Sequence, residues 1–322
     1  RRNSTAVHSP VIAIALAMAW TLHATLNHAR TTMGIPRESA ATAVGITSLF
    51  DFFAPQAEAS IYRDADYMDV IPVLLIHGFP GGASDFAALK RSLSGGALSV
   101  TAPDLLGFGR VASPTRTFEE LWIDAQADAI AATFGELNVT AARKAVVYGH
   151  DYGVMVALAL ANRRPDYVQS LVLSAGNFFA DPPLAPPMRL LGVPGIGSVI
   201  EAALFSKPAN RWMARSGVKR GTEVPAENTP QELAAIRTIF ATALKRRRQI
   251  FPDVERIARS ITVPVRLVWG VNDPFFPGRM MAKRVAETFP NWKMRLESGV
   301  GHFPQIEIPD IVADEIRAAA GL

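Results

Sequence analysis

Short apolar runs recur along the chain from about residue 61 onward, and segments with helical spacing separate them. The runs are rich in β-branched residues and leucine and are bounded by turn residues, so we expect each to form a buried strand. Strands that alternate with helices predict an α/β fold with a mostly parallel sheet and helices on both faces. The expected strands are Val73–Ile76, Ala97–Ala102, Ala145–Tyr148, Ser170–Ser174, Val265–Trp269 and Lys293–Leu296, and the expected helices run from a Ser84 cap to about Leu93 and over Phe118–Phe134, Val154–Ala161 and Asp310–Ala320.

The alternation breaks between Ser174 and Val265. A proline-rich segment, 181–187, opens this stretch, and helical patterns follow at Val199–Phe205 and Glu232–Arg248. Ligands of open α/β sheets bind beyond the carboxyl ends of the strands, so a helical insertion placed there forms a lid. The sequence therefore predicts a core made of residues 61–175 and 256–322, with a helical cap at 176–255.

The first sixty residues lack this regularity, and two interpretations of them stay open. Val11–Trp20 is apolar but shorter than the roughly 20 residues of a membrane-spanning helix, so we expect no integral membrane span. Ala40–Phe50 precedes the triplet 57–59, Ala-Glu-Ala, which has the small-x-small form of a signal-peptidase site, although Asp51 interrupts the apolar region. Residues 1–60 are either a secretion signal or an N-terminal extension that is packed on the surface or poorly ordered, with a cytoplasmic location slightly favoured.

Composition narrows the chemistry. The chain of 322 residues has 49% hydrophobic residues, enough for a large core. It has no cysteine, which excludes disulfides and thiol nucleophiles, and its six histidines and its carboxylates show no metal-binding spacing. The net charge of +4 is modest, and the basic run 245–248 is typical of a solvated helix face. We expect no metal, no cofactor and no nucleic-acid partner, and the sequence carries no signal of oligomeric state.

Gly149-His150-Asp151-Tyr152-Gly153 is the most informative phrase in the chain. It lies between an expected strand and an expected helix, and it has the Gly-x-nucleophile-x-Gly form of a sharp turn that presents a nucleophile. Asp151 stands where most such turns carry a hydroxyl. A carboxylate that attacked an ester would form a high-energy anhydride, whereas attack on an epoxide or an alkyl halide gives an ordinary alkyl ester. The residue type therefore favours substrates that react at saturated carbon.

Five phrases in order resemble the α/β-hydrolase fold family, over residues 61–322. They are His77 to Pro80, Asp104 to Gly109, Gly149 to Gly153, Val268 to Asp273 and Gly301 to Pro304. Within that family the chain resembles the Asp-nucleophile branch of epoxide hydrolases and haloalkane dehalogenases. The segment Leu173 to Phe179 and the Asp-Tyr pair of the elbow are also similar to relatives of the mesoderm-specific transcript protein.

The resemblance implies a role for each residue of the site. Asp151 is expected to attack carbon, and His302, oriented by Asp273, is expected to activate the water that hydrolyses the resulting ester. The backbone N–H groups of Phe79 and Tyr152 are the expected oxyanion donors. The competing interpretations are a turn role for Asp151, a helix-cap or turn role for Asp273 and a structural role for His302. We expect His77, His150 and Asp104 to set loop geometry through hydrogen bonds.

The leaving group separates the two expected activities. Epoxide hydrolases carry tyrosine acids in the insertion, but all five tyrosines of this chain lie outside it. Haloalkane dehalogenases hold the halide with N–H donors at the positions that Phe79 and Tyr152 occupy here. Trp212 in the insertion is the candidate substrate-binding donor, and the competing interpretation is that its ring packs in the core. We favour epoxide opening of a small apolar substrate over dehalogenation. A non-catalytic or binding member of the fold is the third hypothesis.

Overall fold

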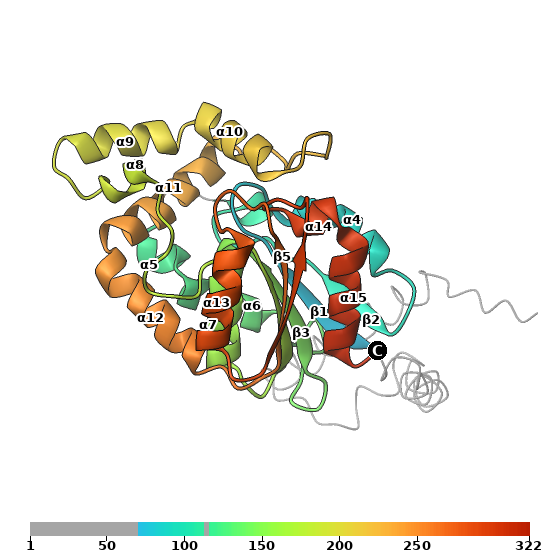
Figure 1. Ribbon diagram of the computed structural model, residues 1–322. Coiled ribbons are helices and arrows are strands. Elements are labelled where there is room, and N and C mark those ends of the chain that lie inside the picture. The colour runs from blue at the N-terminus through green and yellow to red at the C-terminus, as the bar shows by residue number, and fades with distance from the viewer. Residues whose placement is uncertain (1–69, 113–115) are drawn as a thin grey trace, which may run out of the picture. The chain divides into compact units, whose positions relative to one another are not determined.

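The computed structural model describes residues 70–112 and 116–322, and the expectations for residues 1–60 lie outside them. The described residues form a sheet of six strands whose neighbouring pairs are all parallel, in the order β2-β1-β3-β4-β5-β6. Helices cover the sheet in Figure 1. The α/β prediction and its parallel sheet are confirmed. The strands are β1 (Ile71–Ile76), β2 (Leu98–Thr101), β3 (Ala145–His150), β4 (Val168–Ser174), β5 (Val265–Gly270) and β6 (Trp292–Glu297).

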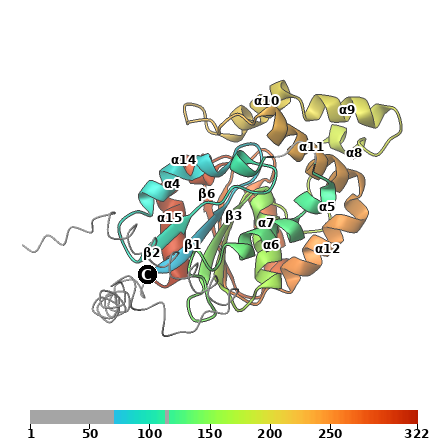
Figure 2. The ribbon, with the colours of Figure 1, turned by 180° about the vertical axis from the view of Figure 1, so that it is seen from behind.

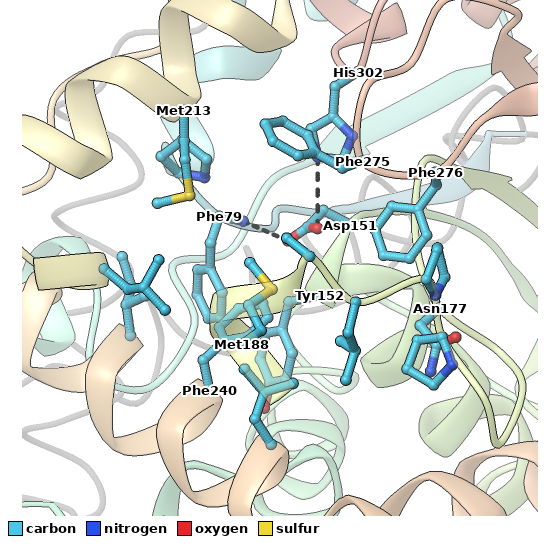
Figure 3. Close-up of a pocket in the computed structure, with 18 of the residues that line it drawn as sticks. Phe79, Asp151, Tyr152, Asn177, Met188, Met213, Phe240, Phe275, Phe276 and His302 are labelled. Atoms are coloured by element: carbon cyan, nitrogen blue, oxygen red, sulfur yellow. Dashed lines mark hydrogen bonds and ion pairs between the residues drawn. The ribbon is translucent and has the colours of Figure 1, made fainter. Parts of the chain in front are cut away.

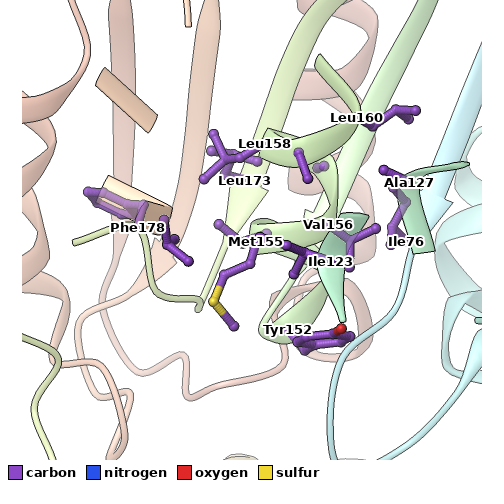
Figure 4. Close-up of a cluster of buried hydrophobic side chains, with 14 of the residues drawn as sticks. Ile76, Ile123, Ala127, Tyr152, Met155, Val156, Leu158, Leu160, Leu173 and Phe178 are labelled. Atoms are coloured by element: carbon purple, nitrogen blue, oxygen red, sulfur yellow. The ribbon is translucent and has the colours of Figure 1, made fainter. Parts of the chain in front are cut away.

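Side chains of the central strands alternate between two hydrophobic cores, one on each face of the sheet. Val73 and Leu75 belong to one core, and Leu74 and Ile76 belong to the other. The first core is closed by α4 (Ala87–Ser92), which follows a 3₁₀ turn at Ala83–Phe86, and by α15 (Pro309–Ala320). In the second core, part of which Figure 4 shows, α6 (Ile123–Ala132) and α7 (Tyr152–Arg163) pack together. Helix α13 (Gly278–Thr288) adds Met281 and Val285 to this core.

Two of the expected helices have different bounds in the structure. The helix expected over Phe118–Phe134 is broken at Trp122, whose extended backbone (φ −73°, ψ 165°) separates α5 (Phe118–Leu121) from α6. The turn before α4 begins at Gly82 rather than Ser84, and the Asp85 carboxylate accepts a hydrogen bond from the Gly82 N–H at 3.0 Å. At the turn before α4, local hydrogen bonding competes with hydrophobic periodicity, because unpaired N–H groups at a helix N-terminus need acceptors.

A helical insertion follows β4 and lies beyond the carboxyl ends of the strands, as Figures 1 and 2 show. The expected helix Glu232–Arg248 is two helices, because Arg246 has a non-helical backbone that ends α11 and precedes α12. The expected cap boundary at residue 255 falls within α12, which packs against α7 and α13 of the core. The insertion comprises α8 (Pro186–Arg189), α9 (Ile196–Leu204), α10 (Lys207–Gly217), α11 (Pro230–Lys245) and α12 (Arg247–Arg259).

Candidate active site

Asp151 lies on a strained turn between β3 and α7. Its backbone has φ 51° and ψ −115°, a conformation that costs a non-glycine residue free energy and persists only where the surroundings hold it. The Asp151 N–H donates to the Ser174 carbonyl at 3.0 Å, and the Asp151 carbonyl accepts from the Val154 N–H at 3.0 Å. A side chain at Gly153 would collide with the Ile76 carbonyl, so glycine is required for α7 to approach β1 this closely.

The two carboxylate oxygens of Asp151 have different partners. Oδ1 accepts a hydrogen bond from the backbone N–H of Phe79 at 2.8 Å, and Oδ2 lies 3.5 Å from Nε2 of His302. Figure 3 shows both interactions at the edge of a cavity. Gly78 precedes the donor, and a side chain there would collide with Cβ of Asp151. One oxygen is therefore held by the backbone while the other faces the imidazole.

His302 is held between two carboxylates. Its Nδ1 lies 3.0 Å from Oδ2 of Asp273, which leaves Nε2 directed at Asp151. Oδ1 of Asp273 in turn accepts from the backbone N–H groups of Phe275 and Phe276 at 2.8 and 3.0 Å. The structure thus brings together the three residues that the sequence identified, from the ends of β3 and β5 and from the loop after β6.

Burial of His302 disfavours its charged form, but the charges of Asp273 and Asp151 outweigh this effect and raise the pKa of His302 to about 10. The imidazole is therefore protonated at neutral pH. Because the folded-state pKa lies above the ordinary value of 6.5, this pairing stabilises the fold fully below pH 6.5 and less as the pH rises towards 10.

The loop that carries His302 is tied to the end of the cap helix α10. The His302 N–H donates to the Gly217 carbonyl at 2.6 Å. The Glu307 carboxylate accepts from the N–H groups of Gly301 at 3.0 Å, Phe303 at 3.3 Å and Lys219 at 3.0 Å. Glu307 thus joins both sides of the histidine loop to the cap. Sequence reasoning missed this residue, whose only signal is a carboxylate five positions after His302.

Asn228 holds the loop that follows Phe79. Its Oδ1 accepts from the Gly81 N–H at 3.0 Å, and its Nδ2 donates to the Gly81 carbonyl at 2.9 Å. Asn210 of α10 donates a further hydrogen bond to Asn228 Oδ1 at 3.1 Å, and both asparagines are buried. The cap therefore fixes the segment that positions the Phe79 donor. The sequence gives no indication of this contact, because Asn228 is 147 positions from Gly81.

Three further polar residues set loop geometry, as expected. Burial lowers the pKa of His77, and its Nε2 accepts from the Leu105 N–H at 3.2 Å. Burial and the neighbouring His302 lower the pKa of His150 to about 4, and its neutral Nε2–H donates to the His302 carbonyl at 2.8 Å. Asp104 accepts from the Arg110 N–H at 3.2 Å.

A cavity of about 420 Å³ opens above Asp151 (Figure 3). This volume falls in the range of small-molecule sites, which are mostly apolar with a few placed polar groups. Core and cap both contribute walls, and the polar members besides Asp151 and His302 are Asn177, Arg189 and Asn210. The apolar lining includes Phe79, Met155, Leu184, Met188, Leu204, Phe205, Met213, Ile236, Phe240, Leu244, Phe251, Phe275 and Phe276.

Neither the Tyr152 hydroxyl nor Trp212, the candidate donor from the sequence, faces Asp151. The Tyr152 ring stacks on Phe79, with centroids 4.7 Å apart, and its hydroxyl donates to the Leu121 carbonyl at 2.7 Å. Trp212 does not line the cavity, and its side chain is 65% exposed, so its assignment to substrate binding is wrong. Helical spacing explains this, because α10 directs the adjacent Met213 inward and Trp212 outward.

The part of the chain that the structure describes contains no cluster of three metal-binding side chains. Over the same residues, no helix is long and apolar enough to cross a bilayer. The expected second oxyanion donor, the Tyr152 N–H, is at the start of α7, where N–H groups lack partners within the helix, and its role stays a prediction.

Comparison with known proteins agrees with this architecture. The sequence model of the alpha/beta hydrolase family matches residues 73–315, and the chain belongs to this family. It is 26% identical to Lipase 3 of Moraxella sp. (strain TA144) over 274 residues, 80% of each chain. It is 27% identical to Haloalkane dehalogenase 2 of Mycobacterium tuberculosis over 263 residues, 76% of this chain and 86% of the relative.

Solved structures show the same fold. An esterase from Thermogutta terrifontis aligns with a TM-score of 0.58 and 23% identity over 78% of this chain and 89% of its own. The haloalkane dehalogenase DbeA from Bradyrhizobium elkani aligns with a TM-score of 0.57 and 22% identity, over 79% and 92%. The narrower resemblances, to the Asp-nucleophile branch and to the mesoderm-specific transcript protein, stay predictions.

The negative charge of Asp151 should have a measurable effect on the pKa of His302. Replacing it, Asp151→Asn, should lower the His302 pKa by at least about one unit, since an opposite charge at this distance shifts a pKa by roughly 1–3 units. NMR titration of the imidazole signals measures this value. The exposed Asp314→Asn variant is the control and should leave the His302 pKa unchanged. An unchanged value in Asp151→Asn would contradict the pairing.

Proposed function

We propose that the protein is a cofactor-independent hydrolase in which Asp151 attacks an electrophilic carbon and forms an alkyl ester. The single observation that carries this proposal is that the two oxygens of the Asp151 carboxylate have different partners. Oδ1 is held by the Phe79 N–H, and Oδ2 faces the cavity beside His302. The apolar walls leave the nucleophilic oxygen poorly solvated, which strengthens its attack on a bound apolar molecule.

The substrate class follows from the balance of protons. In an epoxide, attack by Oδ2 breaks a carbon–oxygen bond, and the ring oxygen needs a proton as it leaves. His302 carries a proton at neutral pH and lines the cavity, so we assign to it the donation of that proton, after which it is neutral. No hydroxyl or indole group among the described cavity-lining residues competes for this role, since the Tyr152 hydroxyl is bonded to Leu121.

The second step uses the neutral imidazole that the first step leaves. Esterification removes the negative charge of Asp151, so only Asp273 still favours the protonated form of His302, and its pKa falls. His302 takes a proton from water, and the hydroxide attacks the carbonyl carbon of the ester. The charge that develops on Oδ1 is stabilised by the Phe79 N–H. Release of a diol restores Asp151 and protonated His302.

Dehalogenation is the second candidate, and two cavity-lining amides favour it. Asn177 Nδ2 donates one hydrogen bond, to the Phe179 carbonyl, and Asn210 Nδ2 donates to Asn228. Each amide nitrogen carries two hydrogens, so a second N–H is available for a halide ion. A halide leaves without a proton, however, and His302 would stay protonated until it lost that proton from a buried site. We therefore favour epoxide hydrolysis.

Trapping the intermediate tests the nucleophile. In His302→Gln the second step lacks its base, which typically contributes about 10²–10⁴-fold, and epoxide opening also lacks its acid. An alkyl bromide, whose halide leaves without a proton, should therefore leave a covalent adduct on the peptide that contains Asp151. Mass spectrometry of the digested protein locates the adduct. The double variant Asp151→Asn/His302→Gln is the matched control and should remain unmodified. An adduct on another residue, or none with any epoxide or alkyl bromide tried, rejects the mechanism.

Two substrates with one carbon skeleton separate the leaving groups. Wild-type protein should convert styrene oxide to its diol faster than it releases bromide from (2-bromoethyl)benzene. Because epoxide opening uses protonated His302, its single-turnover rate should fall as the pH rises above about 10, by roughly tenfold per unit, while alkylation by the bromide should not. Bromide release without diol formation would select the dehalogenase alternative.

A further inference from the structure

The cap helix α9 lacks the charged outer side of an ordinary surface helix. Such a helix turns its charged residues to water and its apolar residues to the core. In α9 the side chains of Ile196 and Val199 are 55% and 70% exposed, whereas Glu201, its one charged residue, is only 9% exposed. Glu201 is directed inward, where it pairs with Arg237 and Lys245 of α11. The exposed side of α9 therefore carries no charge.

Other apolar residues extend this surface on the neighbouring cap segments. Leu190 and Val193 are exposed in the turn before α9, and Trp212 is exposed on α10, which packs against α9. Both ribbon views place α9 and α10 on the side of the cap away from the sheet (Figures 1 and 2). We call these five residues the cap outer face: Leu190, Val193, Ile196, Val199 and Trp212.

Basic residues border the cap outer face. Trp212 lies in a shallow depression together with Lys207, Arg211 and Arg215 of the same helix. Arg211 pairs with Glu227 at 2.6 Å, and Lys207 lies 3.9 Å from the same carboxylate. Two of these three cations contact the single carboxylate of Glu227, so this group of residues carries a net positive charge.

We propose that the cap outer face docks on an anionic lipid bilayer. Interfacial helices combine an apolar side that includes a large aromatic residue with lysine and arginine at the level of the head groups. Trp212 has the amphipathic ring that favours the membrane–water interface, and each cation near an anionic surface strengthens binding roughly fivefold. Val199 and Ile196 would enter the acyl boundary, and Lys207, Arg211 and Arg215 would meet the lipid phosphates.

A bilayer fits this surface better than a second copy of the chain. An isologous pair places the same patch on both partners, so it would bring the cations of one α10 towards those of the other. The same helices also have inner faces that line the cavity, through Leu204 of α9 and Asn210 and Met213 of α10. Apolar molecules concentrate in membranes, and docking would place this cavity wall next to that supply. The inference concerns binding and does not depend on the proposed reaction.

Vesicle co-sedimentation of the full chain tests the proposal. We expect at least tenfold stronger partitioning onto phosphatidylcholine vesicles that contain about 30% phosphatidylglycerol than onto phosphatidylcholine alone, at about 0.1 M salt. The double variant Ile196→Glu/Val199→Glu should weaken partitioning by about tenfold or more. Both positions are exposed, so its thermal unfolding midpoint should match that of the wild type.

A matched pair of tryptophan variants provides the control. Trp212→Ala should reduce partitioning severalfold, whereas Trp292→Ala, at a 39% exposed position on β6, should not. The proposal is overturned by absence of binding to the anionic vesicles, by binding that Ile196→Glu/Val199→Glu leaves unchanged, or by equal losses in the two tryptophan variants. It is also overturned if light scattering shows a dimer that the double glutamate variant dissociates, because the face would then bind a second copy.

Discussion

A protonated imidazole held between two buried carboxylates is the interaction on which the site depends. Burying these charges costs several kcal/mol per ion unless each finds partners, and here backbone groups provide them. The Phe79 N–H compensates Asp151, and two successive N–H groups compensate Asp273. The strained backbone of Asp151 and the close contacts at Gly78 and Gly153 follow from the need to bring these groups to one point. In the proposed reaction, esterification of Asp151 would break the charge balance, and that change would convert His302 from acid to base.

The cap covers the cavity and also holds two loops of the site in place. Asn228 holds Gly81 beside the Phe79 donor, and Gly217 and Lys219 at the end of α10 bind the histidine loop and Glu307. Movements of the cap would therefore change the positions of both the Phe79 N–H and His302, to which we assign the roles of oxyanion donor and base. The cap also carries the cap outer face. The surface that we propose to bind lipid therefore belongs to the same insertion as the groups that hold the loops of Phe79 and His302.

Much of the fold, and the meeting of Asp151, Asp273 and His302, could be predicted from the sequence because both depend on local patterns. Buried strands give short apolar runs, and the elbow needs glycines at fixed offsets around Asp151. The break at Trp122 was missed because the helical spacing of apolar residues continues from α5 into α6. Asn228 and Glu307 were missed because their partners are backbone groups, which leave no trace in residue type. Trp212 was misassigned because helical spacing does not say which face of a cap helix meets the cavity.

A single turnover in oxygen-18 water tests the covalent role of Asp151 most directly. With protein in excess over an epoxide, the oxygen added to the substrate comes from the Asp151 carboxylate, and the water that hydrolyses the ester restores that carboxylate. The account predicts an unlabelled diol from the first turnover and one oxygen-18 atom in the Asp151 peptide. A labelled diol and an unlabelled peptide would mean that water attacks the substrate directly, and would contradict the account.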